Sequence, residues 1–243
     1  MAESIRASPY LSLFPASLED PEAGRPAVTY RFRDPAERPS AAPLPDWWAE
    51  DTDPLVYVSF GSQVGGMPIA GPIFAAVFEA VAALPARVLL TVGHETSADT
   101  FSRPPANVNV ERWVPQADVL GHASAVVCHG GSGTTLGALA AGLPLVVVPL
   151  FADQPDNARR VAAIGAGVAV EPGDEAPREP MRSTIDTSAL RAAIEAVLGD
   201  PKYRRSAERV ADEMRALPPT DAALPTLTST ATASGLFLQA TRA

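Results

Sequence analysis

The stretch VVCHGGSGTTLGALAAG, residues 126–142, and the stretch VVVPLFADQPDNA, residues 146–158, determine the fold expected for this chain. Each begins as an apolar run, stops at a polar or glycine-rich turn, and continues into a helix-forming segment. Apolar runs without alternation indicate strands that are buried on both faces of a parallel sheet. The two stretches therefore predict consecutive strand and helix units of an α/β domain.

The same pattern extends over residues 51–217. We predict strands at Leu55–Phe60, Arg87–Val92, Val108–Arg112, Ala125–Cys128, Leu145–Val148 and Val168–Val170. We predict helices at Gly71–Leu84, Ala117–Gly121, Gly133–Ala141, Pro155–Ile164, Thr187–Leu198 and Pro201–Leu217. Gly142 just after a helix and Pro201 at the first position of another agree with these limits. The expected fold is α/β, with a doubly wound parallel sheet of about six strands and helices on both sides.

The two ends of the chain differ from this central domain. Nine of the 25 prolines fall in the first 54 residues, so residues 1–50 are predicted to be an extended segment that packs against something else. The side chains that need such a surface are Tyr10, Leu11, Leu13, Phe14, Trp47 and Trp48. Residues 218–243 are rich in threonine, serine and alanine without a clear period, and no structure is predicted for them.

Composition excludes several classes of function. The formal net charge of −9 argues against a broad surface for nucleic acid or anionic membrane. The single cysteine, Cys128, cannot form an internal disulfide, so a reducing cytoplasm is the expected compartment. Because Cys128 lies in an apolar run, it is expected to be a buried, inert thiol. The longest uncharged apolar run, Gly142 to Ala152, is about half the length that a membrane-spanning helix needs.

Two glycine-containing strand ends are candidates for an anion site. In VSFGSQVGG, residues 58–66, a strand stops at Gly61 and Ser62; the alternative is a simple flexible loop. In the second, His129 and a run of small residues lead directly into a helix, which places free N–H groups and the positive end of the helix dipole together. Neither the dinucleotide fingerprint nor the P-loop is present. His129 would donate a hydrogen bond to the same anion, although a lone histidine is more often structural.

Polar and aromatic residues follow two further strand ends. Trp113 and Gln116 could recognise a flat heterocycle by stacking and edge hydrogen bonds, although composition alone favours Trp113 as a core aromatic. Asp153 and Gln154 could bind sugar hydroxyls, but Asp153 is equally natural as a helix N-cap. His94 and His122 lack such a context, and loop or surface roles are expected for both.

Trp113 to Ala158 carries, in order, W-x-P-Q, H-x-G and D-Q-x-x-N-A, and so resembles the nucleotide-sugar signature of family 1 glycosyltransferases of the UDP-glycosyltransferase superfamily. The stretch is especially similar to bacterial, actinomycete-like members that glycosylate macrolides, flavonoids or other natural products. The resemblance covers roughly residues 55–217. It implies the C-terminal half of a GT-B fold, in which two Rossmann-like domains face each other and the C-terminal one holds the donor.

The resemblance also implies a role for each candidate residue. Trp113 stacks on the base, Gln116 and the backbone at Val114 read its edge, and Asp153 and Gln154 bind the transferred sugar. The pyrophosphate contacts fall on His129, Ser62, Gly131, Ser132, Gly133 and Thr134. No metal is expected, because acidic residues near the phosphate loop are few. No cofactor is expected either: the nucleotide sugar, a UDP- or dTDP-hexose, is a substrate.

Two departures from the family pattern matter. Many plant members have a glutamate for the ribose hydroxyls where this chain has Gly137, which favours a deoxyribose donor such as a dTDP-sugar. The N-terminal domain, with the acceptor pocket and the histidine that deprotonates the acceptor hydroxyl, is missing. Residues 1–50 resemble its end plus the linker between the domains, so no catalytic base is expected in this chain.

The leading hypothesis is a donor-binding domain of an inverting glycosyltransferase that is inactive alone. The alternative is a donor-binding subunit that works with a separate acceptor-domain chain, as in the two-chain GlcNAc transferase of dolichol assembly. An epimerase of UDP-GlcNAc is less favoured because that chemistry also needs both domains. A self-sufficient hydrolase with His129 as base is disfavoured because no nucleophile and orienting carboxylate accompany that histidine.

Overall fold

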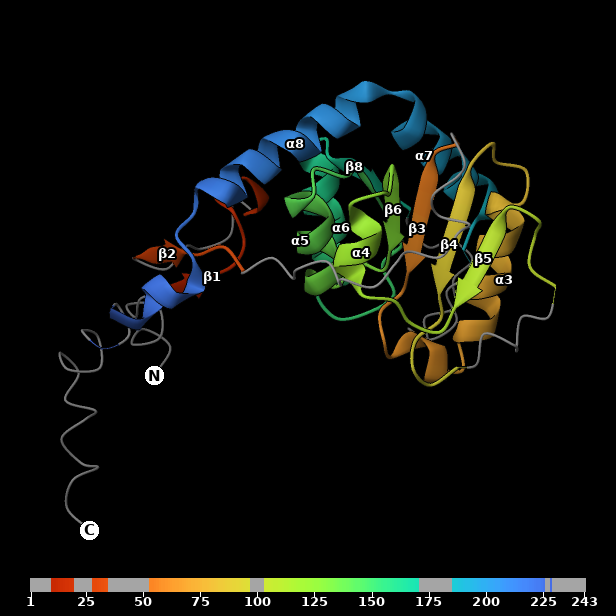
Figure 1. Cartoon of the computed structure of the whole chain (residues 1–243), viewed down its shortest axis with the longest axis horizontal. Coiled ribbons are helices and arrows are strands. Elements are labelled where there is room, and N and C mark those ends of the chain that lie inside the picture. Colours follow the sequence, from red (N-terminus) through yellow and green to blue (C-terminus); the bar gives the residue numbers. More distant parts are fainter. Residues whose placement is uncertain are drawn as a thin grey trace, which may run out of the picture. The chain divides into compact units, whose positions relative to one another are not determined.

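The computed structural model of the chain describes residues 10–19, 28–34, 53–96, 103–170, 185–225 and 228. These residues belong to two compact units (Figure 1). One unit comprises residues 1–35 and 212–243, and the other comprises residues 36–211. The predicted domain limits after residues 50 and 217 stay predictions.

The larger unit is built on a six-stranded sheet in which every neighbouring pair is parallel. Its strands are β3 (Leu55–Ser59), β4 (Arg87–Thr91), β5 (Val108–Glu111), β6 (Ala125–Cys128), β7 (Leu145–Val147) and β8 (Gly167–Ala169). Their order across the sheet is β5-β4-β3-β6-β7-β8. The predicted parallel sheet is confirmed, and each strand lies within one or two residues of its predicted limits.

The strand order creates a switch point between β3 and β6. The chain runs outward from β3 through β4 to β5, then returns to the other side of β3 and runs outward again through β6, β7 and β8. Ser59 is in register with both Thr91 and Cys128, so the carboxyl ends of β3, β4 and β6 are level. The loops that leave these ends therefore meet at one edge of the sheet, which is where ligands bind in open α/β sheets.

Helices cover both faces of the sheet (Figure 1). They are α3 (Ala70–Val81), α4 (Gln116–Leu120), α5 (Ser132–Ala140), α6 (Gln154–Ala163) and α7 (Thr187–Gly199). The next helix, α8 (Pro201–Ala216), begins in this unit and ends among residues of the smaller one. On one face α3 contacts α7, which in turn contacts β6, β7 and β8. On the other face α5 contacts both α4 and α6. All six predicted helices are present, with limits that differ by at most three residues.

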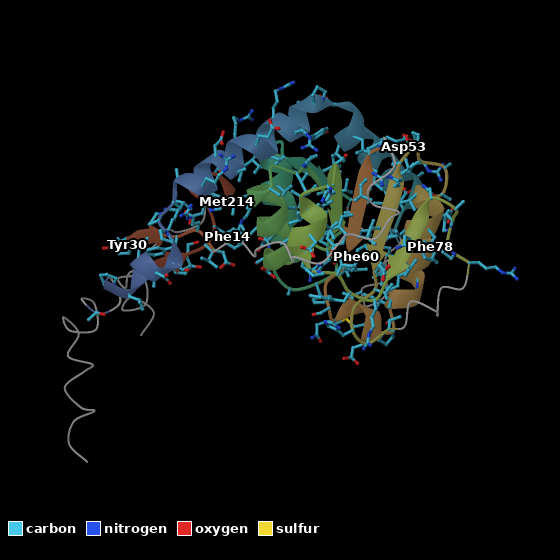
Figure 2. The ribbon with its side chains drawn as sticks, in the orientation of Figure 1. Phe14, Tyr30, Asp53, Phe60, Phe78 and Met214 are labelled. Carbon is cyan, nitrogen blue, oxygen red and sulfur yellow. The ribbon has the colours of Figure 1, made fainter. Side chains whose placement is uncertain are left out.

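Burial on both faces explains the continuous apolar strands. Val56, Val58 and Phe60 belong to the core under α3 and α7, and the intervening residues of β3 are buried as well. Phe60, labelled in Figure 2, meets the ring of Phe74 on α3 edge to face, with ring centroids 6.2 Å apart. Such aromatic pairs stabilise a core beyond the area that they bury.

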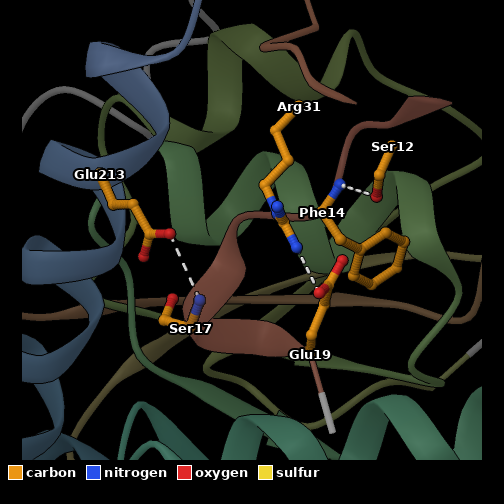
Figure 3. A network of polar contacts seen from close by, with 6 residues as sticks. All are labelled: Ser12, Phe14, Ser17, Glu19, Arg31 and Glu213. Carbon is orange, nitrogen blue, oxygen red and sulfur yellow. Dashed lines mark hydrogen bonds and ion pairs between the residues drawn. The ribbon is translucent and has the colours of Figure 1, made fainter. Parts of the chain in front are cut away.

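The smaller unit contains two parallel three-residue strands, β1 (Tyr10–Ser12) and β2 (Thr29–Arg31), and the short helices η1 (Ala16–Leu18) and η4 (Thr220–Ala222). Polar contacts link its separate segments (Figure 3). Arg31 pairs with Glu19, and the backbone N–H of Ser17 donates to Oε1 of Glu213 at 3.3 Å.

The apolar side chains predicted to need a surface are only partly exposed. Tyr10 and Leu13 are exposed, whereas Leu11 and Phe14 are half-buried. Trp47 and Trp48 lie outside the described residues.

Candidate functional site

His129 stands directly after β6, with its imidazole ring between two glycines. A β-carbon built on Gly61 would lie 3.1 Å from Cε1 of the ring. A β-carbon on Gly131 would overlap Nε2 and lie 2.8 Å from Cε1. Gly61 also has φ of +80°, in the region that favours glycine. The glycines on both sides therefore bring the strand end after β3, the strand end after β6 and the start of α5 together around one side chain.

The electrostatic setting of His129 favours the neutral ring. Burial lowers its pKa below the usual value, while the Ser59 backbone carbonyl and the Asp153 carboxylate act in the opposite direction. At neutral pH the ring can still donate through one nitrogen. A nearby anion would also favour the charged ring and raise its pKa.

The N-terminus of α5 offers further donors next to this ring. Its N-cap residue, Gly131, has no side chain to satisfy the first N–H groups of the helix. A β-carbon on Gly133 would meet nothing within 4 Å, so this first turn faces open space. Ser132 is half-buried and Thr134 is buried, which leaves the backbone and the Ser132 hydroxyl as the groups that a ligand can reach.

Ser62 is exposed in the turn after β3. The turn after β4 packs against this loop and holds it in place. Gly93, with φ of +88°, sits so close that a β-carbon there would lie 2.8 Å from the Ser62 carbonyl oxygen. The Thr96 hydroxyl donates to the Gly65 carbonyl at 2.5 Å. The loops after β3 and β4 therefore form one packed unit.

Asp153 has two partners that link α5 to α6. Its Oδ2 accepts from the Ser132 hydroxyl at 3.4 Å and from Nδ2 of Asn157 at 3.1 Å. Asp153 is the N-cap residue of α6, as the alternative interpretation expected, although its side chain makes no capping hydrogen bond. Asn157 also donates to the Gly130 carbonyl at 2.9 Å. Sequence analysis assigned no role to Asn157, although its place four residues after Asp153 puts both on one helix face.

Gln154 is used differently from Asp153. It is only 4% exposed, and its Oε1 accepts from the backbone N–H groups of Leu150 at 2.9 Å and Phe151 at 3.0 Å. These bonds hold the turn before α6, in which Ala152 has φ of +57°. Both bonds use the oxygen of the Gln154 amide.

Trp113 is 54% exposed, so the interpretation as a core aromatic is wrong. His94 stacks on it, with ring centroids 5.7 Å apart and planes at 24°. The Arg112 guanidinium donates to the His94 carbonyl through Nη2 at 2.6 Å and Nε at 3.1 Å. His94 is itself exposed in the turn after β4, so its predicted loop or surface location is confirmed. The signal for its position is that it follows β4, the neighbour of the strand that Trp113 follows.

Gln116 begins α4, and its side chain lies against α5. A β-carbon on Gly137 would overlap Nε2 of Gln116 and lie 3.4 Å from its Cδ. The Gln116 amide thus occupies the space that a side chain at position 137 would fill. Val114, half-buried, lies between Trp113 and this amide in the turn after β5.

Within the described ranges, no group of three or more His, Cys, Asp or Glu side chains is placed to hold a metal ion. In the same part of the chain, none of the helices combines the length and apolar character needed to cross a bilayer.

Comparisons with known proteins agree on one family. The family model described as "Erythromycin biosynthesis protein CIII-like, C-terminal domain" matches residues 75–228. The chain is 40% identical over 171 residues to the elloramycin glycosyltransferase ElmGT of Streptomyces olivaceus, a match that covers 70% of this chain and 40% of that protein.

Solved structures give the same picture. The glycosyltransferase SnogD from Streptomyces nogalater matches with a TM-score of 0.70 and 28% identity over 90% of this chain and 56% of that one. The spinosyn rhamnosyltransferase SpnG complexed with thymidine diphosphate matches with a TM-score of 0.72 and 27% identity, again over 90% of this chain and 56% of that one. The chain thus spans about half the length of its solved relatives and less of the curated one.

Proposed function

Because this chain belongs to the family of erythromycin biosynthesis protein CIII-like C-terminal domains, we propose that it binds the nucleoside diphosphate sugar of an inverting glycosyltransferase. The resemblance to bacterial natural-product glycosyltransferases and the GT-B fold are confirmed. We propose further that the whole enzyme transfers a hexose to a hydroxyl of a small natural-product acceptor.

One observation carries the proposal: the ring of His129 is held between Gly61 and Gly131 at the N-terminus of α5. A diphosphate placed there would meet the helix dipole, the free N–H groups of the first turn and a ring N–H at once. Charge-assisted hydrogen bonds of this kind are the stronger ones in proteins. The site needs no lysine, arginine or metal to hold an anion.

The remaining contacts follow from the position of each side chain. The exposed Trp113 offers a stacking surface for the base, and the Gln116 amide and the Val114 backbone lie near it in the chain. Ser62, Ser132, Gly133 and Thr134 line the two strand ends that we assign to the phosphates. We assign the sugar hydroxyls to Asp153 and to the amide nitrogen of Gln154.

The proposed reaction is a direct displacement. An acceptor oxygen, deprotonated by a base from an acceptor domain, attacks the anomeric carbon as its bond to the diphosphate oxygen breaks. The negative charge that develops on the leaving diphosphate is stabilised by His129 and the N-terminus of α5. In this proposal the chain supplies donor binding and leaving-group stabilisation, and the acceptor domain supplies the base.

We propose that the base comes from an acceptor domain, since the chain spans only 40% of the elloramycin glycosyltransferase and 56% of SnogD. Whether that domain is on the same polypeptide or on a separate chain is the alternative to be tested. Co-purification of a stoichiometric partner from native cells favours a separate chain, and a contiguous upstream reading frame for the domain contradicts it.

Isothermal titration of the chain with UDP, dTDP and GDP tests the donor site. We expect saturable binding of UDP or dTDP and a loss of about 10-fold or more in His129→Ala, because a hydrogen bond to a charged group is removed. His122→Ala is the matched control, because His122 precedes β6 and so lies toward the amino ends of the strands, away from the proposed site at their carboxyl ends. Equal affinity of wild type and His129→Ala contradicts the phosphate role, and no binding by the folded chain contradicts an autonomous donor site.

A further inference from the structure

The indole of Trp113 has two faces, and His94 covers one of them. The rings of the two residues are stacked, with centroids 5.7 Å apart, yet Trp113 is still 54% exposed. Exposed aromatic surface of this size in a strand-end loop is available to a flat ligand. One face of the indole is therefore supported by protein, and the rest is accessible.

The His94 backbone is held from two directions. From the position directly after β5, the Arg112 guanidinium donates two hydrogen bonds to the His94 carbonyl. From the loop after β3, Gly93 packs on the Ser62 carbonyl, and the Thr96 hydroxyl donates to the Gly65 carbonyl. The turn that carries His94 is thus fixed both to the strand that presents Trp113 and to the loop assigned to the phosphates.

We propose that His94 is a positioning residue for nucleotide binding: it supports one face of Trp113 so that the nucleobase stacks on the other. The inference rests on the proposed function of the site. Supporting the indole in advance lowers the ordering cost that binding would otherwise carry. The base would complete a three-ring stack in which only Trp113 touches the ligand and His94 acts through it.

The turn also relates the two halves of the nucleotide site. Through His94, residues 93–96 contact Trp113, which we assign to the base. Through Gly93 and Thr96, the same residues contact the loop after β3, which we assign to the phosphates. A ligand that carries both a base and a diphosphate would therefore use both contacts of this turn. A diphosphate without a base would use only the second.

Three variants and two ligands test this. His94→Ala, His94→Phe and His122→Ala are titrated with whichever of UDP and dTDP binds wild type more tightly, and with inorganic pyrophosphate by competition. We expect His94→Ala to weaken the nucleotide about 2- to 10-fold, the equivalent of one stacked aromatic pair, with pyrophosphate affinity unchanged. His94→Phe should stay within about twofold of wild type because it keeps the stack, and His122→Ala should match wild type.

Each other result has a definite meaning. Nucleotide affinity that is unchanged or higher in His94→Ala overturns the inference and leaves the donor site intact, because the base would then bind without His94 or displace it. An equal loss of affinity for nucleotide and pyrophosphate also overturns it, because His94 would then stabilise the loop assigned to the phosphates and not the stacking surface of Trp113. Failure of wild type to bind any nucleotide overturns the proposed function, and the inference with it.

Discussion

The imidazole ring of His129 fills the space that a β-carbon on Gly131 would need, since such a carbon would overlap Nε2 and lie 2.8 Å from Cε1. The backbone of Gly131, with φ of −62° and ψ of 140°, is open to any residue. Glycine at this position is therefore required by the ring and not by the backbone. Replacing Gly131 therefore tests the steric contact with the ring alone, without the backbone strain that arises when a glycine of positive φ is replaced.

Gly131→Ala is expected to displace the His129 ring. We expect a loss of stability of about 1–3 kcal/mol from overpacking and a fall in nucleoside diphosphate affinity of about 10-fold from the misplaced donor. Calorimetric titration and denaturant unfolding measure the two. Gly71→Ala in α3 is the control, because a β-carbon there meets nothing within 4 Å. Its affinity should match wild type, and its stability should be unchanged or up to about 1 kcal/mol higher, since alanine favours the helix. Wild-type affinity in Gly131→Ala would show that the ring position does not matter.

Nucleotide binding is expected to take up protons through His129. In the free chain burial holds the pKa of His129 below its usual value, so the ring is neutral at pH 7. A bound diphosphate favours the charged ring and raises that pKa, so affinity should increase as pH falls toward the pKa of the complex. Titration at pH 7 in two buffers with different ionisation enthalpies gives the number of protons taken up. His129→Gln should take up fewer, and equal numbers would contradict the assignment.

The same shift predicts the pH dependence of stability. The unfolded His129 binds a proton more readily than the folded one, so protonation favours unfolding. Its contribution to stability is full above its unfolded pKa and is lost as pH falls through the folded pKa. Urea unfolding between pH 5 and 8 should therefore show a smaller dependence on pH in His129→Gln than in wild type.

The Cys128 thiol is expected to be unreactive in the folded chain. Cys128 is fully buried at the end of β6, and burial raises its pKa to about 11. At pH 8 the thiolate that reacts with disulfide reagents is therefore scarce as well as inaccessible. Ellman's reagent should label no thiol in the native chain and one thiol per chain in guanidinium chloride. Rapid native labelling would show that the strand end opens.

The sequence predicts those features of the fold that depend on residues close together in the chain. Continuous apolar runs such as Val126 to Cys128 and stop signals such as Gly142 are properties of the chain itself, so they predicted the strands and helices closely. The contacts that His94 makes with Trp113 and Asn157 makes with Gly130 were not predicted, because each depends on a neighbour in another loop. Trp113 is likewise exposed because of its position in the loop after β5, whereas its amino-acid type alone favoured a buried core residue.

Gly137 and Gln116 are expected to act as one unit. A β-carbon on Gly137 would push the Gln116 amide aside, and that amide is the flexible end of a side chain. Gly137→Ala should therefore leave stability within about 1 kcal/mol, since alanine also favours the helix, while it lowers nucleotide affinity. In a double-mutant cycle with Gln116→Ala, the second substitution should add nothing to the loss. Additive losses would show that Gly137 and Gln116 act independently.

Asp153→Asn is expected to weaken sugar nucleotides more than the free diphosphate. The substitution keeps the shape of the side chain but removes the charge that accepts from Ser132 and Asn157 and that we assign to the sugar hydroxyls. Hydrogen bonds to a charged group are the stronger ones, so UDP-glucose and dTDP-glucose should lose about 10-fold in affinity. UDP and dTDP should lose little or gain, because a negative charge next to the proposed diphosphate site is removed. Asp156→Asn, on the exposed first turn of α6, is the control and should leave the ratio of the two affinities unchanged. If Asp153→Asn also leaves that ratio unchanged, the sugar lies elsewhere and Asp153 serves only to link α5 to α6.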